Sequence, residues 1–137
     1  MSFFYVDSSA IVKLIWAEAE SAALAEFVLF DERAAKTLIT SAVSRTEVLR
    51  ATRRRDESLL GRARQVLETF SEFEITDSIV ETAALVGSAQ LRTLDAIHLA
   101  TAMENAAGMR ALITYDTRLA QAAREVGLPV ASPGVTE

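Results

Sequence analysis

The chain has 137 residues, of which 50% are hydrophobic and 24% charged, so we expect one folded domain rather than a disordered chain. It contains no cysteine and one histidine, which excludes disulfides, thiolate–zinc sites, iron–sulfur clusters and multi-histidine metal sites. The net charge of −5 argues against a uniformly basic nucleic-acid-binding coat. Neither a secretory signal nor an apolar run of about 18 residues is evident, so a cytoplasmic protein is expected.

Short apolar runs alternate with longer helical patterns along the chain. The patterns predict strands at 3–6, 37–40, 73–76, 111–114 and 127–131, and helices at 8–16, 20–30, 41–54, 56–70, 77–86, 94–107 and 116–126. The expected helix caps are the polar residues Ser41, Asp56, Asp77, Thr93 and Asp116.

Strands joined through helices require crossover connections, which is typical of parallel sheets. The predicted fold class is therefore α/β, a three-layer α/β/α domain whose central parallel sheet of four or five strands is flanked by helices. We expect residues 1–131 to form this single domain and residues 132–137 to form a flexible C-terminal tail.

Four acidic residues are predicted to reach one edge of this sheet. Asp7 follows the first strand, Asp116 lies just beyond the fourth, and Asp95 and Glu47 lie near the starts of helices. The ends of parallel strands and the starts of the following helices meet at the same edge, where ligands bind. Converging carboxylates repel one another unless a cation neutralises them, and oxygen ligands alone select Mg²⁺ or Mn²⁺. Such a metal can activate water for phosphodiester hydrolysis.

Each acid also has a purely structural interpretation. Asp7 and Asp116 are natural helix N-caps, the helix dipole favours Asp95 in a first turn, and Glu47 can be an ordinary solvated helix residue. The helix that contains Asp95 is apolar nearly all round over residues 94–102, so it must be mostly buried. A carboxylate on such a helix needs a partner, which favours the joint interpretation.

Four motifs, in order along the chain, resemble those of PIN-domain proteins, in particular the VapC-type toxins of toxin–antitoxin pairs. The central motif is the run Leu-Arg-Thr-Leu-Asp-Ala-Ile-His-Leu-Ala-Thr-Ala at 91–102. The other three are Tyr-Val-Asp-Ser-Ser-Ala at 5–10, Ser-Arg-Thr-Glu at 44–47, and Thr-Tyr-Asp-Thr-Arg-Leu at 114–119 followed by Gly-Leu-Pro-Val at 127–130.

The resemblance implies a PIN fold and a Mg²⁺- or Mn²⁺-dependent endoribonuclease that acts as a toxin. It implies a catalytic quartet of Asp7, Glu47, Asp95 and Asp116, in which the three aspartates hold the metal directly or through water and Glu47 orients or deprotonates the attacking water. It also implies an RNA substrate, a homodimer and a cognate VapB-type antitoxin that holds the toxin inactive. Some family members carry a further acid shortly after the last aspartate, whereas this chain has Thr-Arg-Leu at 117–119, so a second metal is not expected.

Five further residues have two interpretations each. The hydroxyls of Ser9 and Thr114 can hold the carboxylates or metal-bound waters, or can simply satisfy a strand end. His98 is interpreted as a structural histidine bonded to a backbone carbonyl in preference to a ligand or general base. Arg50 and Arg54 share the helical stripe of Glu47, so they can follow an RNA backbone from the metal site or form part of a solubilising face.

The sequence also bears on three other functions. An aspartyl-phosphate phosphatase usually has a second aspartate two residues after the nucleophile, where this chain has Ser9. A phosphorylatable receiver domain is disfavoured because no acidic pair precedes Asp7. A catalytically inactive PIN-like module that binds RNA or protein is the alternative to the ribonuclease.

Overall fold

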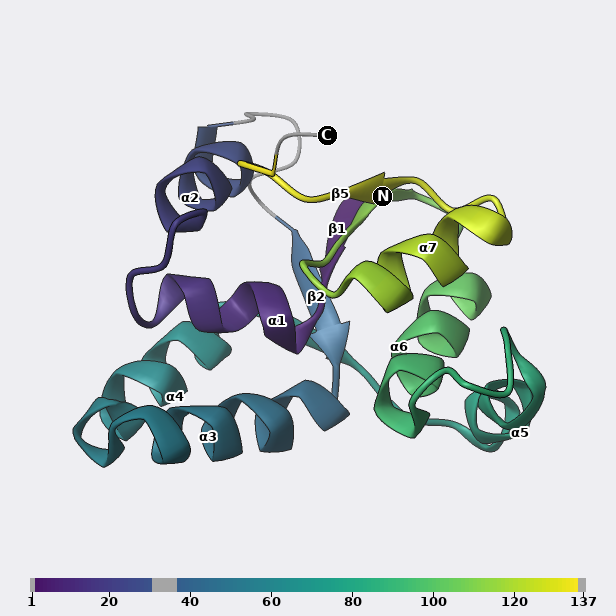
Figure 1. Ribbon diagram of the computed structural model, residues 1–137, viewed down its shortest axis with the longest axis horizontal. Helices are drawn as coiled ribbons and strands as arrows, with labels where there is room; N and C mark the ends of the chain where they lie inside the picture. The colour runs from purple at the N-terminus through teal and green to yellow at the C-terminus, as the bar shows by residue number, and fades with distance from the viewer. Residues whose placement is uncertain (1, 31–36, 136–137) are drawn as a thin grey trace.

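The computed structural model describes residues 2–30 and 37–135 and contains one five-stranded sheet (Figure 1). The strand order is β3-β2-β1-β4-β5, and every pairing is parallel. The strands are β1 (Phe3–Val6), β2 (Leu38–Ser41), β3 (Ser71–Phe73), β4 (Met109–Ile113) and β5 (Val130–Ala131). The predicted parallel sheet is confirmed.

Helices cover both faces of the sheet, as the three-layer prediction requires (Figure 1). Side chains from α1 to α4 form one core cluster with the sheet, and side chains from α6 and α7, beside α5, form the other. Among the described residues no helix has the length and apolar character needed to cross a membrane. The helices are α1 (Ser8–Ile11), the 3₁₀ turn η1 (Val12–Leu14), α2 (Ser21–Phe30), α3 (Val43–Arg55), the 3₁₀ turn η2 (Glu57–Leu59), α4 (Leu60–Glu68), α5 (Asp77–Leu85), α6 (Thr93–Glu104) and α7 (Thr117–Glu125).

The central strand, β1, is buried along its whole length. Its side chains alternate between the two faces, as a strand requires. Phe4 and Val6 belong to the cluster under α1 to α4, whereas Phe3 and Tyr5 belong to the cluster under α6 and α7. Asp7 follows β1 directly, so the most buried strand of the sheet carries the first acid to the sheet edge.

Two boundaries on the first half of the sheet differ from the predictions. The strand predicted at 73–76 lies at Ser71–Phe73, where the backbone pairs with β2 although two of its three side chains are exposed. Ser41 was expected to cap the next helix but is the last residue of β2, and the N-cap residue Ala42 has no side-chain cap. The Ser41 hydroxyl still accepts a hydrogen bond from the Val43 amide at 3.2 Å.

Two caps in the second half of the chain are also displaced by one residue. Thr76, in extended conformation, accepts a hydrogen bond from Ile79 N and caps α5, so Asp77 is the first helical residue, where the dipole favours an acid. The helix α6 begins at Thr93 itself and ends at Glu104, earlier than predicted. The expected caps Asp56 and Asp116 are confirmed.

The segment expected to form a tail begins with two hydrogen-bonded residues. The Ser132 hydroxyl donates to Thr114 O at 2.6 Å, and Pro133 O accepts from the Tyr115 hydroxyl at 2.7 Å. Both bonds join the segment to the chain that follows β4. Residues 136–137 of the predicted tail lie outside the described residues.

Candidate functional site

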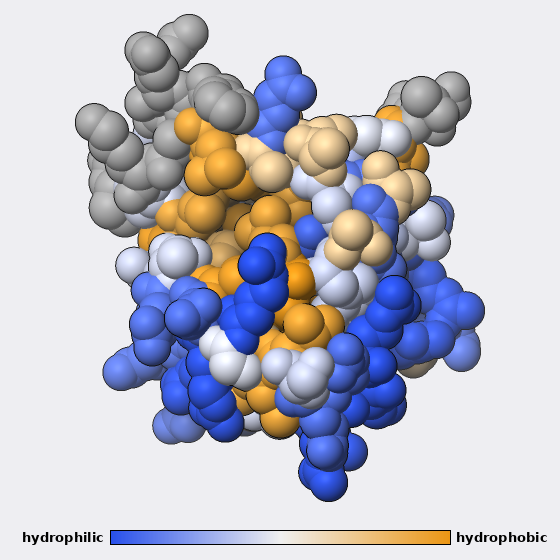
Figure 2. All heavy atoms as spheres, turned by 90° about the vertical axis from the view of Figure 1, so that its left-hand side faces the viewer, coloured by the Kyte–Doolittle hydropathy of each residue, from blue (hydrophilic) through white to orange (hydrophobic). Residues whose placement is uncertain are grey.

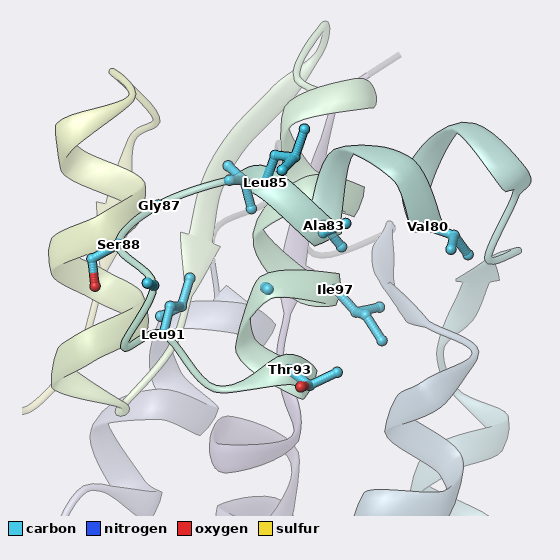
Figure 3. A pocket seen from close by; sticks show the side chains of 12 residues that line it. Val80, Ala83, Leu85, Gly87, Ser88, Leu91, Thr93 and Ile97 are labelled. Atoms are coloured by element: carbon cyan, nitrogen blue, oxygen red, sulfur yellow. The ribbon is translucent and has the colours of Figure 1, made fainter.

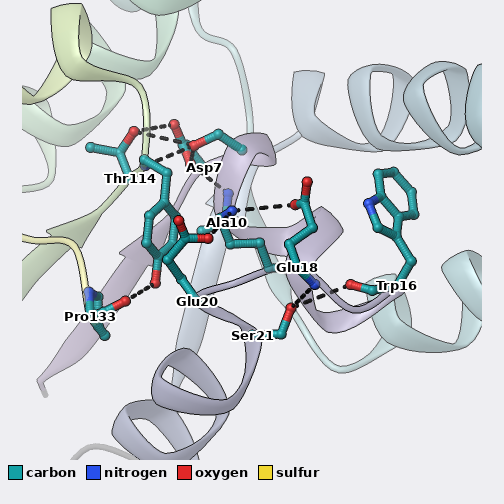
Figure 4. A network of polar contacts seen from close by, with 11 residues as sticks. Asp7, Ala10, Trp16, Glu18, Glu20, Ser21, Thr114 and Pro133 are labelled. Carbon is teal, nitrogen blue, oxygen red and sulfur yellow. Dashed lines mark hydrogen bonds and ion pairs between the residues drawn. The ribbon is translucent and has the colours of Figure 1, made fainter. Parts of the chain in front are cut away.

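Asp7 lies at the end of β1, where it caps α1, and its carboxylate is 2% exposed (Figure 4). Its Oδ1 accepts hydrogen bonds from the Ser9 hydroxyl at 2.7 Å and from Ala10 N at 3.1 Å. Its Oδ2 accepts a hydrogen bond from the Thr114 hydroxyl at 2.6 Å. Burial raises the pKa of Asp7, against the lowering effects of the His98 charge and these donors. Both carboxylate oxygens are therefore held in place.

The same two hydroxyls connect Asp7 to Asp116. Thr114 Oγ1 accepts the Asp116 amide hydrogen at 3.1 Å, and Ser9 Oγ accepts the Tyr115 amide hydrogen at 2.9 Å. Oδ1 of Asp116 caps α7 by accepting from the amides of Arg118 and Leu119. The capping and carboxylate-holding interpretations of Ser9 and Thr114 therefore describe one network rather than two alternatives.

Asp95 lies in the first turn of α6, and its Oδ2 is buried with no hydrogen-bond partner among the described residues. Burial, followed by the charge of Asp116, raises the pKa of Asp95 to about 6. Asp7 and Glu47 raise this pKa as well, whereas His98 lowers it. The other three acids predicted from the sequence therefore lie within electrostatic reach of Asp95.

Glu47 contacts His98 rather than another acid. His98 is 1% exposed, its Nε2 lies 2.7 Å from Glu47 Oε1, and its Nδ1 lies 2.7 Å from the Tyr5 hydroxyl. The interpretation that a backbone carbonyl satisfies His98 is wrong. Burial lowers the pKa of His98, but the Glu47 hydrogen bond and the charges of Asp7, Glu47 and Asp95 outweigh burial and raise it.

Tyr5 was not predicted as part of the site. It is a core residue, with no exposed surface, but its hydroxyl is used. The available signal was the strand alternation, because Tyr5 and Asp7 are two residues apart and point to the same side of the sheet. Nothing in the sequence indicates that His98 on α6 reaches Glu47 on α3.

Lys13 is already paired with two glutamates. Lys13 donates to Glu20 at 2.8 Å and to Glu18 at 3.3 Å, and its ammonium lies 4.6 Å from the centre of the Tyr115 ring. Figure 4 shows Glu18 and Glu20 on the same side of the molecule as Asp7. The Tyr115 hydroxyl donates to Pro133 O. Lys13 therefore binds the chain between η1 and α2 to the site instead of supplying a free positive charge.

Residues 4–125 match the family described as PIN domain. The chain belongs to the PIN-domain family. This PIN domain is 44% identical over 132 residues to Ribonuclease VapC35 of Mycobacterium tuberculosis, an alignment that covers 95% of this chain and 96% of the relative.

Solved structures of VapC-type proteins share the fold of this PIN domain. The crystal structure of Mycobacterium tuberculosis VapC20, a sarcin–ricin loop cleaving toxin, superposes with a TM-score of 0.73 at 16% identity, covering 96% of this chain and all of that one (100%). A toxin–antitoxin complex from Klebsiella pneumoniae superposes with a TM-score of 0.67 at 25% identity, covering 95% of this chain and 97% of the other.

A groove of about 360 Å³ in the PIN domain begins at Glu47 and runs between α1, α3 and the start of α6. Its walls include Val12 and Leu94, and Arg50 and Arg54 also line it. Both arginines are exposed, and neither has an ion-pair or hydrogen-bond partner within residues 2–30 and 37–135. The sequence analysis could not separate them from the neighbouring arginines that are engaged elsewhere, namely Arg45 with Glu72, Arg53 with Glu57 and Arg62 with backbone carbonyls.

A larger cavity of about 590 Å³ lies between α5, the following loop and α6 (Figure 3). Its walls are mostly apolar side chains, such as Val80, Leu91 and Ile97, and it includes none of the four acids. The hydroxyls of Ser88 and Thr93 are its polar side chains. This cavity has no charged group for catalysis, so the groove at Glu47 is the better candidate for the functional site.

The oxygen atoms of these acids are the ligand type that a hard divalent cation prefers. Their spacing in the structure suits such a cation less well. Asp7, Asp95 and Asp116 offer only oxygen ligands, and the unpartnered Oδ2 of Asp95 is a buried acceptor that a cation would satisfy. Over residues 2–30 and 37–135, however, no group of three or more acidic or histidine side chains is arranged to hold a metal ion as it stands.

Proposed function

We propose that this protein is a Mg²⁺- or Mn²⁺-dependent endoribonuclease and the toxin of a toxin–antitoxin pair, acting on cytoplasmic RNA. The observation that carries the proposal is the buried carboxylate oxygen of Asp95, which has no partner among the described residues. Burial raises the pKa of Asp95, and the charges of Asp116, Asp7 and Glu47 raise it further. Such a cluster has a free-energy cost that a cation relieves. The 44% identity to a protein named as a ribonuclease supports the reaction class.

In the proposed mechanism Asp7, Asp95 and Asp116 hold the cation. When bound, the cation supplies positive charge that stabilises the phosphate oxygens during attack. Ser9 and Thr114 keep both oxygens of Asp7 in fixed directions. Glu47 would orient a water molecule with the carboxylate oxygen that His98 does not occupy and accept its proton as the water oxygen bonds to phosphorus. The P–O bond to the leaving nucleotide then breaks, and the leaving oxygen takes a proton from solvent.

The groove at Glu47 is proposed to hold the RNA next to the scissile phosphate. Arg50 and Arg54 follow Glu47 at one-turn intervals on α3, and their guanidinium groups have no other partner among the described residues. Free guanidinium groups bind phosphate oxygens through two parallel hydrogen bonds. The local charge along this groove thus suits RNA although the net charge of the protein is −5.

RNA cleavage in the presence of Mg²⁺ or Mn²⁺ tests the proposed function. Wild type should cleave, and chelation should stop it, whereas Asp7→Asn and Asp95→Asn should reduce cleavage to background. Asp56→Asn is a matched control because Asp56 is an exposed helix cap outside the cluster, and asparagine caps equally well. Cleavage by either site variant at the wild-type rate would remove the assigned site.

Mn²⁺ binding gives a second measurement that does not depend on finding the correct RNA. The thermal midpoint of wild type should rise with Mn²⁺ concentration, because a ligand that binds only the folded protein stabilises it. The midpoint of Asp95→Asn should not change, and that of Asp56→Asn should rise as wild type does. An unchanged wild-type midpoint at millimolar Mn²⁺ would count against the metal.

A VapB-type antitoxin is the proposed protein partner. Figure 2 shows a band of apolar surface, bordered by hydrophilic side chains, on the side of the molecule where α1 to α4 lie in Figure 1. On this side α2 exposes Phe27 (37%) and Leu29 (61%). An exposed apolar band of this kind favours a protein partner. The structurally similar Klebsiella pneumoniae protein was solved in a toxin–antitoxin complex.

Co-expression tests the antitoxin. The product of a neighbouring small reading frame should restore growth to cells that express this chain and should co-purify with it. Leu29→Glu should weaken that complex without abolishing RNA cleavage, because Leu29 lies outside the acidic cluster. Failure of every adjacent reading frame to restore growth would contradict the pairing.

Homodimerisation is proposed on the resemblance to VapC-type toxins. Exposed apolar side chains on α5, Leu85 at 88% and Val80 at 51%, support self-association on that side of the molecule. Light scattering should give twice the mass of the chain for wild type and the mass of one chain for Leu85→Glu. A monomeric wild type at micromolar concentration would contradict the dimer.

One observation favours a second candidate function. Because the described acids are not grouped for metal binding as they stand, a PIN-like module that binds RNA or protein without cleaving it is the alternative. Calorimetry separates the two. Heat of Mn²⁺ binding that disappears in Asp95→Asn supports the nuclease, whereas tight RNA binding without any metal binding supports the inactive module.

A further inference from the structure

A chain of two hydrogen bonds, one buried and one partly buried, ends at Glu47. It starts at the Tyr5 hydroxyl on β1, crosses the His98 ring on α6 and reaches Glu47 Oε1 on α3, with 2.7 Å at each step. Tyr5 and His98 are 0% and 1% exposed, while the Glu47 side chain is 18% exposed. Three elements from distant parts of the sequence are thus joined at the one acid that the metal-holding set does not include.

The proton positions in this chain follow from the chemistry of Glu47. An ionised carboxylate accepts hydrogen bonds only, so His98 Nε2 must carry a hydrogen and donate it to Oε1. In the neutral ring Nδ1 is then the acceptor and takes the hydrogen of the Tyr5 hydroxyl. In the charged ring Nδ1 donates to the hydroxyl oxygen of Tyr5, and the bond to Glu47 is unchanged. The His98–Glu47 bond therefore has the same direction in both protonation states of the ring.

We propose that His98, held by Tyr5, is a positioning residue for Glu47 in the nuclease reaction, an inference that rests on the proposed function. A glutamate side chain on a helix surface samples several rotamers. The rigid, buried ring fixes one oxygen of Glu47 and leaves Oε2 to face the water that it orients. A hydrogen-bonded partner behind a reactive carboxylate commonly sets its direction and basicity in this way.

A purely structural role for His98 makes a different prediction. If the ring only fills the core and joins α6 to α3, its loss lowers the free energy of unfolding and affects activity equally whether or not Glu47 is present. A positioning residue acts through Glu47, so its loss has no further effect on kcat once Glu47 has been neutralised.

A double-mutant cycle on RNA cleavage tests this distinction. His98→Leu should lower kcat about 10–100-fold with KM nearly unchanged. His98→Gln should recover most of the loss, because its amide nitrogen reaches the place of Nε2 and donates to Oε1. In a Glu47→Gln background neither change should lower kcat further. Thr52→Val is the control, because Thr52 is buried on the same α3 helix and its hydroxyl bonds only Val48 O.

Nuclear magnetic resonance of the ring gives a readout that does not require activity or a His98 variant. The chain has a single histidine, so its ring ¹⁵N signals need no assignment. The ¹⁵N shifts should report a protonated Nε2 at neutral pH, and the Nε2–H proton should move upfield in Glu47→Gln. Tyr5→Phe should alter the Nδ1 signal and lower kcat by less than His98→Leu does.

The outcomes separate this inference from the proposed function. Ring signals that do not change in Glu47→Gln, or equal kcat losses for His98→Leu with and without Glu47, would overturn the positioning role while leaving the nuclease intact. A wild-type protein that cleaves no RNA with either metal would overturn the proposed function and the catalytic purpose of the His98–Glu47 bond together. Loss confined to stability, with kcat unchanged in His98→Gln and His98→Leu, would also overturn the positioning role.

Discussion

Asp7 and Asp95 carry the same side chain within electrostatic reach of each other, yet the fold surrounds them differently. Asp7 accepts three hydrogen bonds, from Ser9, Ala10 and Thr114, and is almost completely buried. Asp95 has a buried oxygen without any partner among the described residues. Both carboxylate oxygens of Asp7 are hydrogen-bonded without a ligand, whereas one buried oxygen of Asp95 has no partner among the described residues.

One site can therefore combine a carboxylate that hydrogen bonds hold in place, Asp7, with a carboxylate that a ligand would affect strongly, Asp95. Donors around Asp7 oppose the rise in its pKa that burial causes, while the neighbouring acids raise the pKa of Asp95 further, to about 6. Ligand binding should therefore change Asp95 most and Asp7 least.

The largest effect on stability is expected when the Asp7 carboxylate loses a hydrogen-bond donor. Thr114→Val leaves a buried carboxylate oxygen and the Asp116 amide without their partner, which should lower the free energy of unfolding by about 2–3 kcal/mol at pH 7.5. Thr114→Ser keeps the hydroxyl and should lose only about 1 kcal/mol, for one methyl group. Urea denaturation measures both. Equal losses for the two variants would show that the donor does not matter.

A smaller effect of opposite sign is expected at the Asp95 corner. Because the folded pKa of about 6 exceeds the ordinary value of 3.8, the folded protein binds this proton more readily than the unfolded chain. Stability from this group is therefore present below pH 4 and is lost as the pH rises toward 6, in the metal-free protein. Asp95→Asn should be more stable than wild type at pH 7.5, by about 1 kcal/mol once solvent screening of this partly exposed group is allowed for.

Denaturation of the metal-free protein at pH 4, 5, 6 and 7.5 measures this dependence. The control Asp56→Asn should keep the wild-type loss between pH 4 and 6, because Asp56 is exposed and remote from the cluster. If Asp95→Asn and wild type have parallel pH profiles, the contrast between the two corners is wrong.

The smallest effect on stability is expected at the rim of the groove. Arg50→Ala and Arg54→Ala remove exposed side chains without partners in the described structure, so the free energy of unfolding should change by less than about 0.5 kcal/mol. Each should weaken RNA binding and reduce the salt dependence of log K by about 0.7. Arg53→Ala, which breaks a surface pair with Glu57, is the control and should leave that slope unchanged.

Local rules were enough to predict the strand before Asp7, the helix that Asp116 caps and the parallel sheet between them. They failed where a neighbouring element decides the outcome. The backbone at Ser71–Phe73 is a strand because β2 pairs with it, although its exposed side chains give no buried-strand pattern. The bond from His98 to Glu47 spans 51 residues and depends on how α6 packs near α3, which no spacing along the chain encodes.

The same limit applies to the basic residues. The sequence concentrates arginine between positions 45 and 64. It does not indicate which of these arginines form ion pairs and which do not. Arg45 forms an ion pair with Glu72 on β3. The start of this strand was itself predicted two residues too late in the sequence. Long-range packing therefore decides which charges remain available.

The place of β1 in the middle of the sheet has a consequence for synthesis of the protein. Asp7 receives its Thr114 donor from a residue 107 positions later in the chain. At a translation rate of about 5–20 residues per second, roughly 5–20 seconds separate the two residues on the ribosome. Throughout that interval the first strand lacks its β4 neighbour, and the acidic cluster does not exist. The proposed catalytic site therefore cannot form on the nascent chain until β4 and the start of α7 have emerged.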